Sequence, residues 1–182
     1  MMPFLIPALV LVGALCVLDL ILTLGVVKRL RDHTALLANT SAVDTYTINV
    51  GEHVGEFTSS SVDGEEVTHQ LPEEDTLVAF FSPTCGPCKD KLPKFVEHVE
   101  RRGIARERVL VAIVGDAEES RGFIEQLSPV ARVVSERSDG LLTAAFKVKA
   151  FPTVLTVSPD GVGGTVVTDN DVRLDAPAAL AA

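Results

Sequence analysis

The amino-acid sequence predicts an α/β protein in which helices flank a central mixed sheet, preceded by one transmembrane helix. Residues 3–27 form a long apolar stretch, which predicts the transmembrane helix. Two shorter apolar runs, residues 76–82 and 108–115, have the length and continuity of buried strands, and a helical pattern follows each of them. Two β-rich runs joined by a turn follow in residues 152–168, so the sheet contains antiparallel as well as parallel strands.

Residues 1–27 are predicted to form an N-terminal transmembrane anchor. A helix of about 20 residues crosses the hydrocarbon core, and the apolar stretch carries a single charge, Asp19. A cleaved signal peptide is the alternative, but no Lys or Arg precedes the stretch, and no convincing small-x-small cleavage site precedes Lys28. We therefore expect an uncleaved single-pass anchor, with Asp19 as a lone carboxyl group and Cys16 as an apolar packing residue.

The chain is predicted to divide into four parts. After the anchor come a juxtamembrane linker (28–47), a folded domain (48–168) and a weakly structured C-terminal tail (169–182) with few apolar residues to hold it. Asp116 is placed to cap the start of a helix. The predicted elements of the domain are strands at 65–71, 76–82, 108–115 and 131–136, helices at 86–101, 117–127 and 140–148, and a hairpin at 152–168 with its turn at 158–161.

Charge and residue types exclude two kinds of binding site. The net charge is −9, so we do not expect a surface that binds nucleic acid. A structural zinc site needs four ligands, but Cys85 and Cys88 form one pair and the third cysteine lies in the predicted anchor. The histidines are too scattered to complete such a site: His33, His53, His69 and His98. We therefore expect no metal and no separate cofactor.

Cys85 and Cys88, separated by Gly86 and Pro87, are predicted to be a redox pair. A bridge between them would close a very small loop and contribute little stability, which suits a disulfide that opens and closes. Cys85 follows a buried strand and begins a helix, where unsatisfied N–H groups favour a thiolate. Pro87 is tolerated in the first helical turn, and Lys89 adds positive charge. Cys88 lies one turn further on, within reach of a mixed disulfide at Cys85.

The stretch TLVAFFSPTCGPCKDKLPKF resembles the active-site strand and helix of thioredoxins. Pro93, eight residues after Cys85, matches the proline that kinks the helix of that family. The segment AFPT, residues 150–153, opens a β-rich run, as does the cis-proline loop that faces the cysteines in thioredoxins. The resemblance implies a thioredoxin-like fold, a cis bond between Phe151 and Pro152, and a Phe151 backbone that pairs with substrate.

The sequence from Ile48 onward is similar to the start of TlpA-like thiol-disulfide oxidoreductases, which carry a glycine, an acidic residue followed by Phe, and an Asp-Gly turn before the active-site strand. The matching residues are Gly51, Phe57, Asp63 and Gly64. The long separation between the cysteines and Pro152 implies the inserted strand and helix of the TlpA and redoxin group. The anchor and the residues after it are similar to MauD-like members, which are accessory proteins for methylamine dehydrogenase maturation.

Three residues near the cysteines depart from the thioredoxin pattern. Ala79 stands six residues before the first cysteine, where thioredoxins bury an aspartate that transfers protons. Phe81 replaces the usual Trp, and Thr84 replaces the aromatic residue before the first cysteine. Glu118 or Glu119 could take over the proton transfer, but negative charge at a helix start is the simpler explanation of both.

We expect a protein-disulfide oxidoreductase in which Cys85 attacks a disulfide, Cys88 resolves the intermediate, and a redox-active Cys85–Cys88 disulfide results. Reduction is the favoured direction, because CGPC accompanies a potential of about −270 mV in thioredoxin. A peroxiredoxin-like peroxidase is one alternative, against which the C-x-x-C pair argues. A non-catalytic thioredoxin-like tethering module is another, against which the intact CGPC and Phe-Pro-Thr segments argue.

The expected partners are proteins with thiols or disulfides and, by resemblance, a membrane donor that supplies reducing thiols. Lys28, Arg29 and Arg31 follow the apolar stretch and no basic residue precedes it, so the positive-inside rule places the folded domain in the cytoplasm. The TlpA-like resemblance implies the opposite side, where soluble thioredoxin is absent. We expect a single-pass protein of the cell membrane with an extracytoplasmic domain.

Overall fold

A computed structural model describes residue 13 and residues 47–71 and 75–174 of the chain. Apart from Gly13, these residues belong to one compact unit, Val43–Ala182. No helix within the described ranges combines the length and the apolar character that a membrane crossing requires. The predicted anchor (1–27), except for Gly13, and the predicted linker up to residue 46 lie outside the described residues.

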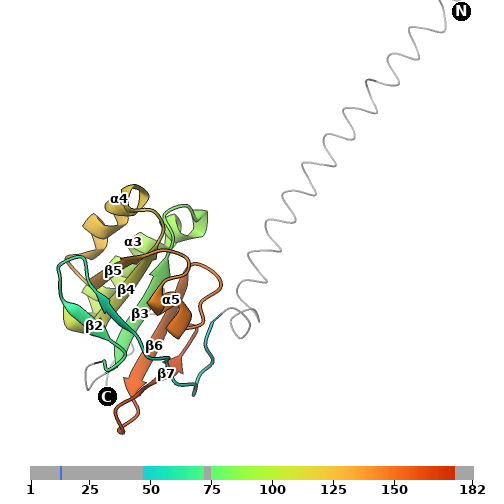
Figure 1. Ribbon diagram of the computed structural model, residues 1–182. Coiled ribbons are helices and arrows are strands. Elements are labelled where there is room, and N and C mark those ends of the chain that lie inside the picture. The colour runs from blue at the N-terminus through green and yellow to red at the C-terminus, as the bar shows by residue number, and fades with distance from the viewer. Residues whose placement is uncertain (1–12, 14–46, 72–74, 175–182) are drawn as a thin grey trace, which may run out of the picture. The chain divides into compact units, whose positions relative to one another are not determined.

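A five-stranded mixed sheet forms the centre of the folded unit (Figure 1). Its strand order is β5-β4-β3-β6-β7; β3, β4 and β5 are parallel, while β6 is antiparallel to both β3 and β7. The strands are β3 (Thr76–Phe81), β4 (Val109–Val114), β5 (Arg132–Glu136), β6 (Thr153–Pro159) and β7 (Thr165–Asp169). The prediction of a mixed α/β sheet is therefore confirmed.

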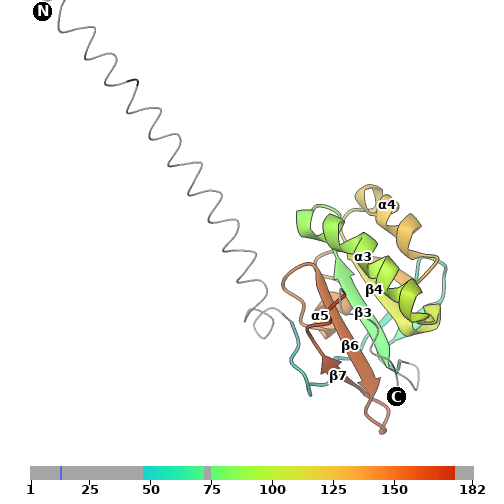
Figure 2. The ribbon, with the colours of Figure 1, turned by 180° about the vertical axis from the view of Figure 1, so that it is seen from behind.

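Helices cover both faces of this sheet. Figure 2 shows α3 (Gly86–Arg102) and α4 (Ala117–Leu127) together on one face, with α5 (Leu141–Ala145) on the other. A short 3-10 helix, η2 (Arg106–Arg108), leads from α3 into β4. The helix predicted at 117–127 is confirmed residue for residue, and Asp116 occupies its N-cap position, although its side chain makes no capping hydrogen bond.

The continuous apolar pattern of β3 follows from this two-sided cover, because successive side chains point to opposite faces and both faces are buried. Val78 and Phe80 enter a core cluster with Phe146, next to α5. Leu77, Ala79 and Phe81 enter a second cluster beneath α3 and α4, which also contains Cys88. Packing on both faces therefore fixes the position of β3, including its carboxyl end.

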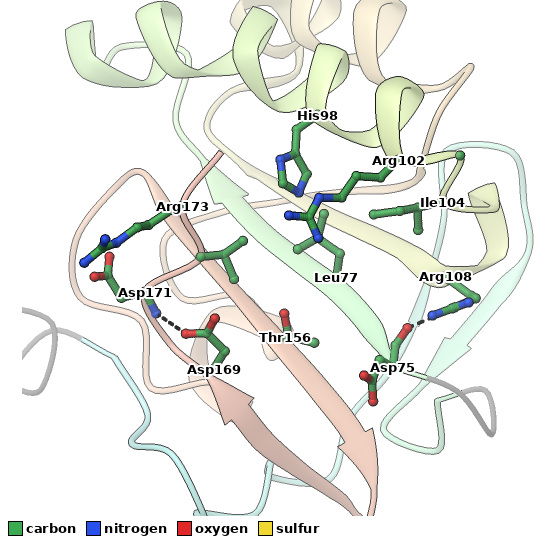
Figure 3. Close-up of a pocket in the computed structure, with 12 residues that line it drawn as sticks. Asp75, Leu77, His98, Arg102, Ile104, Arg108, Thr156, Asp169, Asp171 and Arg173 are labelled. Atoms are coloured by element: carbon green, nitrogen blue, oxygen red, sulfur yellow. Dashed lines mark hydrogen bonds between the residues drawn. The ribbon is translucent and has the colours of Figure 1, made fainter. Parts of the chain in front are cut away.

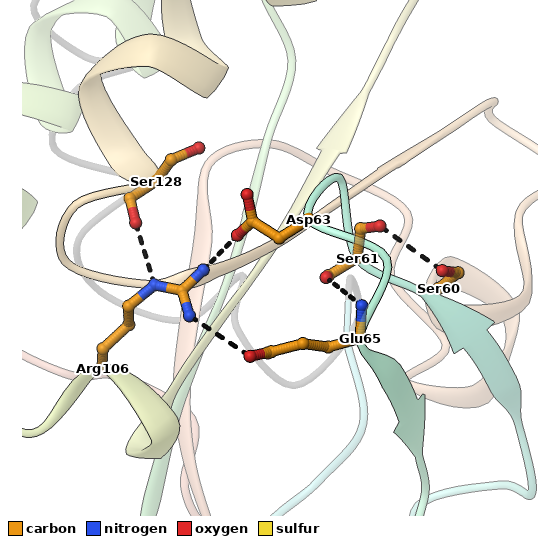
Figure 4. Close-up of polar contacts among 6 residues, drawn as sticks. All are labelled: Ser60, Ser61, Asp63, Glu65, Arg106 and Ser128. Atoms are coloured by element: carbon orange, nitrogen blue, oxygen red, sulfur yellow. Dashed lines mark hydrogen bonds and ion pairs between the residues drawn. The ribbon is translucent and has the colours of Figure 1, made fainter.

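The small second sheet differs from the prediction. The strand predicted at 65–71 is shorter, β2 (Glu66–Thr68), and it pairs with β1 (Thr58–Ser60) in a separate two-stranded sheet. Strand β1 was not predicted, because its residues Thr-Ser-Ser show no apolar alternation that would indicate a strand. Arg106 supports this small sheet: its guanidinium pairs with Asp63 and Glu65, and its Nε donates to the Ser128 carbonyl at 2.9 Å (Figure 4).

The predicted hairpin is confirmed, but its predicted turn at 158–161 is wrong. Strand β6 continues through Pro159, and the turn lies at residues 160–164, where the Asp160 carboxylate accepts hydrogen bonds of 2.8 Å from the backbone N–H groups of Val162 and Gly164. Pro159 is tolerated because β3 no longer pairs with β6 at this point: the last pair between them joins Thr76 and Val157.

Candidate active site

The turn between β3 and α3 positions the first cysteine. The N–H of Cys85 donates to the carbonyl of Ser82 at 3.1 Å, which closes a turn with Pro83 at its second position, where the fixed φ of proline fits best. Cys85 has extended backbone angles (φ −86°, ψ 118°) and is the N-cap of α3. The first turn of this helix contains Pro87 and no acidic residue, so no carboxylate offsets its positive end.

The two cysteines have different environments, as the redox prediction requires. Cys88 is completely buried in the apolar cluster beneath α3, among residues such as Leu92 and Phe95. Cys85 is only partly buried and lies at the edge of the same cluster. Both side chains carry free thiols in this structure, so the geometry described is that of the reduced pair.

Ser82 contacts both sulfur-bearing residues through its backbone. In addition to the turn hydrogen bond with Cys85, its N–H donates to the Sγ of Cys88 at 3.4 Å. Its hydroxyl lies 3.2 Å from the hydroxyl of Thr84 within the same turn. The relative placement of Cys85 and Cys88 therefore depends on one short stretch of backbone.

Burial, and after it the hydrogen bond with Cys85, raises the pKa of the Cys88 thiol to about 12. The N–H of Ser82 and the charge of Lys91 act in the opposite direction and only partly compensate. Cys88 is accordingly a neutral thiol near pH 7, protected from solvent and from attack. This is the environment expected of a resolving cysteine, which reacts only after a mixed disulfide has formed beside it.

The loop before β6 lies beside the cysteines. The Phe151–Pro152 bond is cis, as the resemblance to thioredoxins implies. The thiol of Cys85 donates to the carbonyl of Phe151 at 3.4 Å, although the two residues are 66 positions apart. Strand pairing explains the contact: Thr153, which begins β6, is the partner of Phe80 near the carboxyl end of β3. The Phe151 side chain is half-buried and packs against both core clusters.

The remaining predicted site residues lie on the exposed side of the helix start. Gly86, Pro87 and Lys89 are all solvent-exposed in the first turn of α3. The charge that acts on Cys88 comes instead from Lys91, which the sequence analysis did not single out. Its spacing of three residues from Cys88 along a helix was the available signal.

Ala79 is completely buried in the cluster that encloses Cys88, so this position supplies a methyl group and no proton acceptor. Glu118 and Glu119 are exposed in the first turn of α4 and do not contribute to the pKa shift of Cys88. In the described part of the chain, no three or more His, Cys, Asp or Glu side chains gather as they would around a metal ion.

An open groove of about 650 Å³ lies at the other end of the central strand (Figure 3). Asp75 and Leu77, at the start of β3, belong to its lining, whereas the cysteines follow the carboxyl end of that strand. Burial lowers the pKa of His98, so its ring is neutral at pH 7 and Nδ1–H donates to the Leu174 carbonyl at 3.1 Å. Arg101 donates to the same carbonyl at 3.1 Å. These contacts hold the chain after β7 against α3.

Comparison with solved structures identifies the fold. The chain is similar to the thioredoxin domain of a thiol-disulfide oxidoreductase from Bacteroides vulgatus, with 17% identity and a TM-score of 0.53 over 69% of this chain and 90% of that one. A thiol:disulfide interchange protein from a Bacteroides species gives 18% identity and a TM-score of 0.53 over 70% and 84%. A thiol-disulfide oxidoreductase from Bacteroides fragilis gives 13% identity and a TM-score of 0.52 over 67% of this chain and 91% of that one.

These similarities show that the chain has the thioredoxin-like fold, as the resemblance implies. Neither a protein-family model nor a curated protein sequence matches the chain. The TlpA-like and MauD-like types remain predictions from the sequence.

The different environments of the two thiols predict selective alkylation. In the reduced protein at pH 8, iodoacetamide should modify Cys85 well before Cys88, since a pKa of about 12 leaves only about one Cys88 thiol in 10⁴ ionised. Peptide-resolved mass spectrometry against time measures both rates, and unfolding in urea should equalise them. Equal rates for the two cysteines in the folded protein would contradict the structure.

Proposed function

We propose that this chain is a thiol-disulfide oxidoreductase that acts by dithiol-disulfide exchange through Cys85 and Cys88, with protein disulfides as substrates and reduction as the favoured direction. One observation carries the proposal: an accessible thiol at a helix start lies beside a completely buried thiol one turn further on. The solved structures with the same fold that are compared above are thiol-disulfide oxidoreductases or interchange proteins by their own descriptions, and they support the same chemistry here.

The first step is attack by Cys85. As a thiolate, its Sγ forms a bond with one sulfur of the substrate disulfide, the substrate S–S bond breaks, and one substrate thiolate leaves and takes up a proton. Cys85 stands at the N-cap of α3, whose first turn contains no acidic residue that would repel the sulfur atoms of a substrate thiolate. The product is a mixed disulfide between Cys85 and the substrate.

The second step is attack by Cys88 on the Sγ of Cys85. Cys88 loses its proton, the Cys85–Cys88 bond forms, and the second substrate thiolate leaves and is protonated. The substrate has then gained two electrons and two protons, and the protein has lost them. A dithiol donor must reduce the Cys85–Cys88 disulfide before the next cycle, and a membrane protein that supplies thiols fits this requirement.

The loop at Phe151 and Pro152 is proposed to hold the substrate during both steps. The Phe151 carbonyl already accepts a hydrogen bond from the Cys85 thiol, so a substrate chain that reaches Cys85 also reaches this backbone. Gly86 and Pro87 are exposed next to Cys85 and leave space for such a chain. The half-buried side chain of Phe151 packs on both core clusters and keeps the loop in place.

Membrane attachment and an extracytoplasmic domain are part of the same proposal. The apolar stretch at 3–27 and the TlpA-like resemblance support it, whereas Lys28, Arg29 and Arg31 favour the cytoplasmic side. A tethered reductase is most useful in an oxidising compartment, where disulfides form and persist. We give this argument the greater weight.

Substitution of each cysteine should separate the two steps. We expect Cys85→Ser to reduce the rate of insulin disulfide reduction to background, because a hydroxyl does not replace the attacking thiolate. Cys88→Ser should instead accumulate a mixed disulfide at Cys85 that mass spectrometry detects without reducing agent. Cys16→Ser is the matched control and should keep the full rate. Insulin reduction by Cys85→Ser at the wild-type rate would refute the proposed function.

Reporter fusions test the proposed side of the membrane. Alkaline phosphatase joined after Ala182 should be active in cells, because it requires the disulfides that form outside the cytoplasm. A fusion to a reporter that works only in the cytoplasm, such as β-galactosidase, should be inactive at the same site. The reverse pattern would place the domain in the cytoplasm, as the positive-inside rule indicates.

A further inference from the structure

Gly115, the residue that follows β4, lies directly against the active-site turn. A Cβ atom on Gly115 would lie 2.9 Å from Cδ and 3.3 Å from Cγ of Pro83, and 3.6 Å from the hydroxyl of Ser120. The first distance is shorter than real side-chain contacts allow. Gly115 does not have a positive φ, so its backbone conformation would suit any residue. The neighbouring Pro83 ring, and not the local backbone, is therefore what excludes a side chain at this position.

Pro83 has little freedom to move away from such a side chain. Its Cδ belongs to a ring that includes the backbone nitrogen, so displacement of the ring displaces the main chain. Pro83 is buried and occupies the second position of the turn from Ser82 to Cys85. The first residue of this turn, Ser82, donates a hydrogen bond from its N–H to the Sγ of Cys88. A shift of Pro83 would thus change the placement of both sulfur atoms.

The other side of Gly115 is fixed as well. Its N–H donates to the carbonyl of Glu136, the last residue of β5, at 3.0 Å. The Glu136 carboxylate in turn accepts hydrogen bonds from the N–H groups of Leu142 and Thr143 at 3.1 and 2.8 Å, at the start of α5. Gly115 is therefore held between β5 and the active-site turn and cannot retreat to make room for a methyl group.

We propose that Gly115 is a positioning residue for the redox pair. Because Gly115 has no side chain, the Pro83 ring packs directly against it. This contact sets the geometry of Cys85 relative to Cys88 and to the Phe151 carbonyl. The proposal rests on the proposed exchange function and adds to it a residue from the neighbouring strand. It also explains why a glycine follows β4 although the backbone conformation there does not require one.

The test compares Gly115→Ala with Gly122→Ala in the full-length chain in detergent. Gly122 lies in α4 with nothing within 4 Å of an added Cβ, so it provides the same chemical change without a collision. We expect Gly115→Ala to slow insulin reduction about tenfold, since small displacements of reacting groups cost large factors in rate. It should also change the pH profile of Cys85 alkylation by iodoacetamide, whereas Gly122→Ala should match the wild type in both measurements.

A double variant tests the proposed contact directly. Pro83→Ala removes the two ring atoms that the new methyl group would strike, so Gly115→Ala combined with Pro83→Ala should be less impaired than the sum of the two single variants predicts. If Gly115→Ala alone does not fold, the variants are compared by melting temperature instead of by rate, and the double variant should recover folding. Strictly additive effects, or a double variant that also fails to fold, would overturn the proposal.

Alkylation separates this inference from the proposed function, because it needs no disulfide substrate. If wild-type protein does not reduce insulin but Gly115→Ala still changes the alkylation profile of Cys85, the positioning role holds and the proposed reaction fails. A Gly115→Ala profile identical to that of the wild type and of Gly122→Ala would refute the positioning role whatever the reductase activity.

Discussion

The backbone of Ser82 is the constraint on which the rest of the site depends. Its carbonyl accepts the hydrogen bond that places Cys85 at the start of α3, and its N–H donates to the Sγ of Cys88. Ser82 has a fixed position because it follows β3, whose six residues are all buried between two layers of helices. The packing of the whole sheet therefore determines the geometry of two sulfur atoms at its carboxyl edge.

The difference between the two thiols follows from the same packing. Cys85 lies at the surface end of the turn, where the start of α3 provides a positive environment, whereas Cys88 points into the apolar cluster that contains Ala79. Desolvation then keeps Cys88 protonated, and the Ser82 N–H and Lys91 offset only part of this effect. With a methyl group at position 79, loss of the Cys88 proton becomes the step on which the second half of the proposed reaction depends.

The sequence predicted those features that local pattern and side-chain chemistry determine. The bounds of α4, the buried strand β3 and the helix start at Cys85 follow from apolar periodicity and turn residues. The cis Phe151–Pro152 bond followed from the thioredoxin resemblance alone. Features that depend on distant neighbours left no such signal.

Backbone groups and close approaches account for most of what was missed. Ser82 acts through its N–H and carbonyl, which every non-proline residue possesses, so its side chain gives no indication of this role. In the sequence, Gly115 is an ordinary glycine after a strand, and only the structure shows that Pro83 lies against it. The turn after β6 lies later than predicted because β7 still pairs with Ser158 and Pro159, a register that residues 158–161 do not encode.

The most direct test of the mechanism is the pH dependence of the second step alone. A mixed disulfide between Cys85 and 5-thio-2-nitrobenzoate can be prepared, and the release of the coloured thiolate by Cys88 followed in stopped flow from pH 6 to 10. Burial is the main cause of the raised Cys88 pKa of about 12, and we expect Cys88 to stay buried in this intermediate. Since only the Cys88 thiolate attacks, the rate at which the coloured thiolate is released should rise about tenfold per pH unit across the whole range. A rate that reaches a plateau at a pH lower than 8 and stays constant up to pH 10 would show that Cys88 ionises readily and would contradict the proposed control of the reaction.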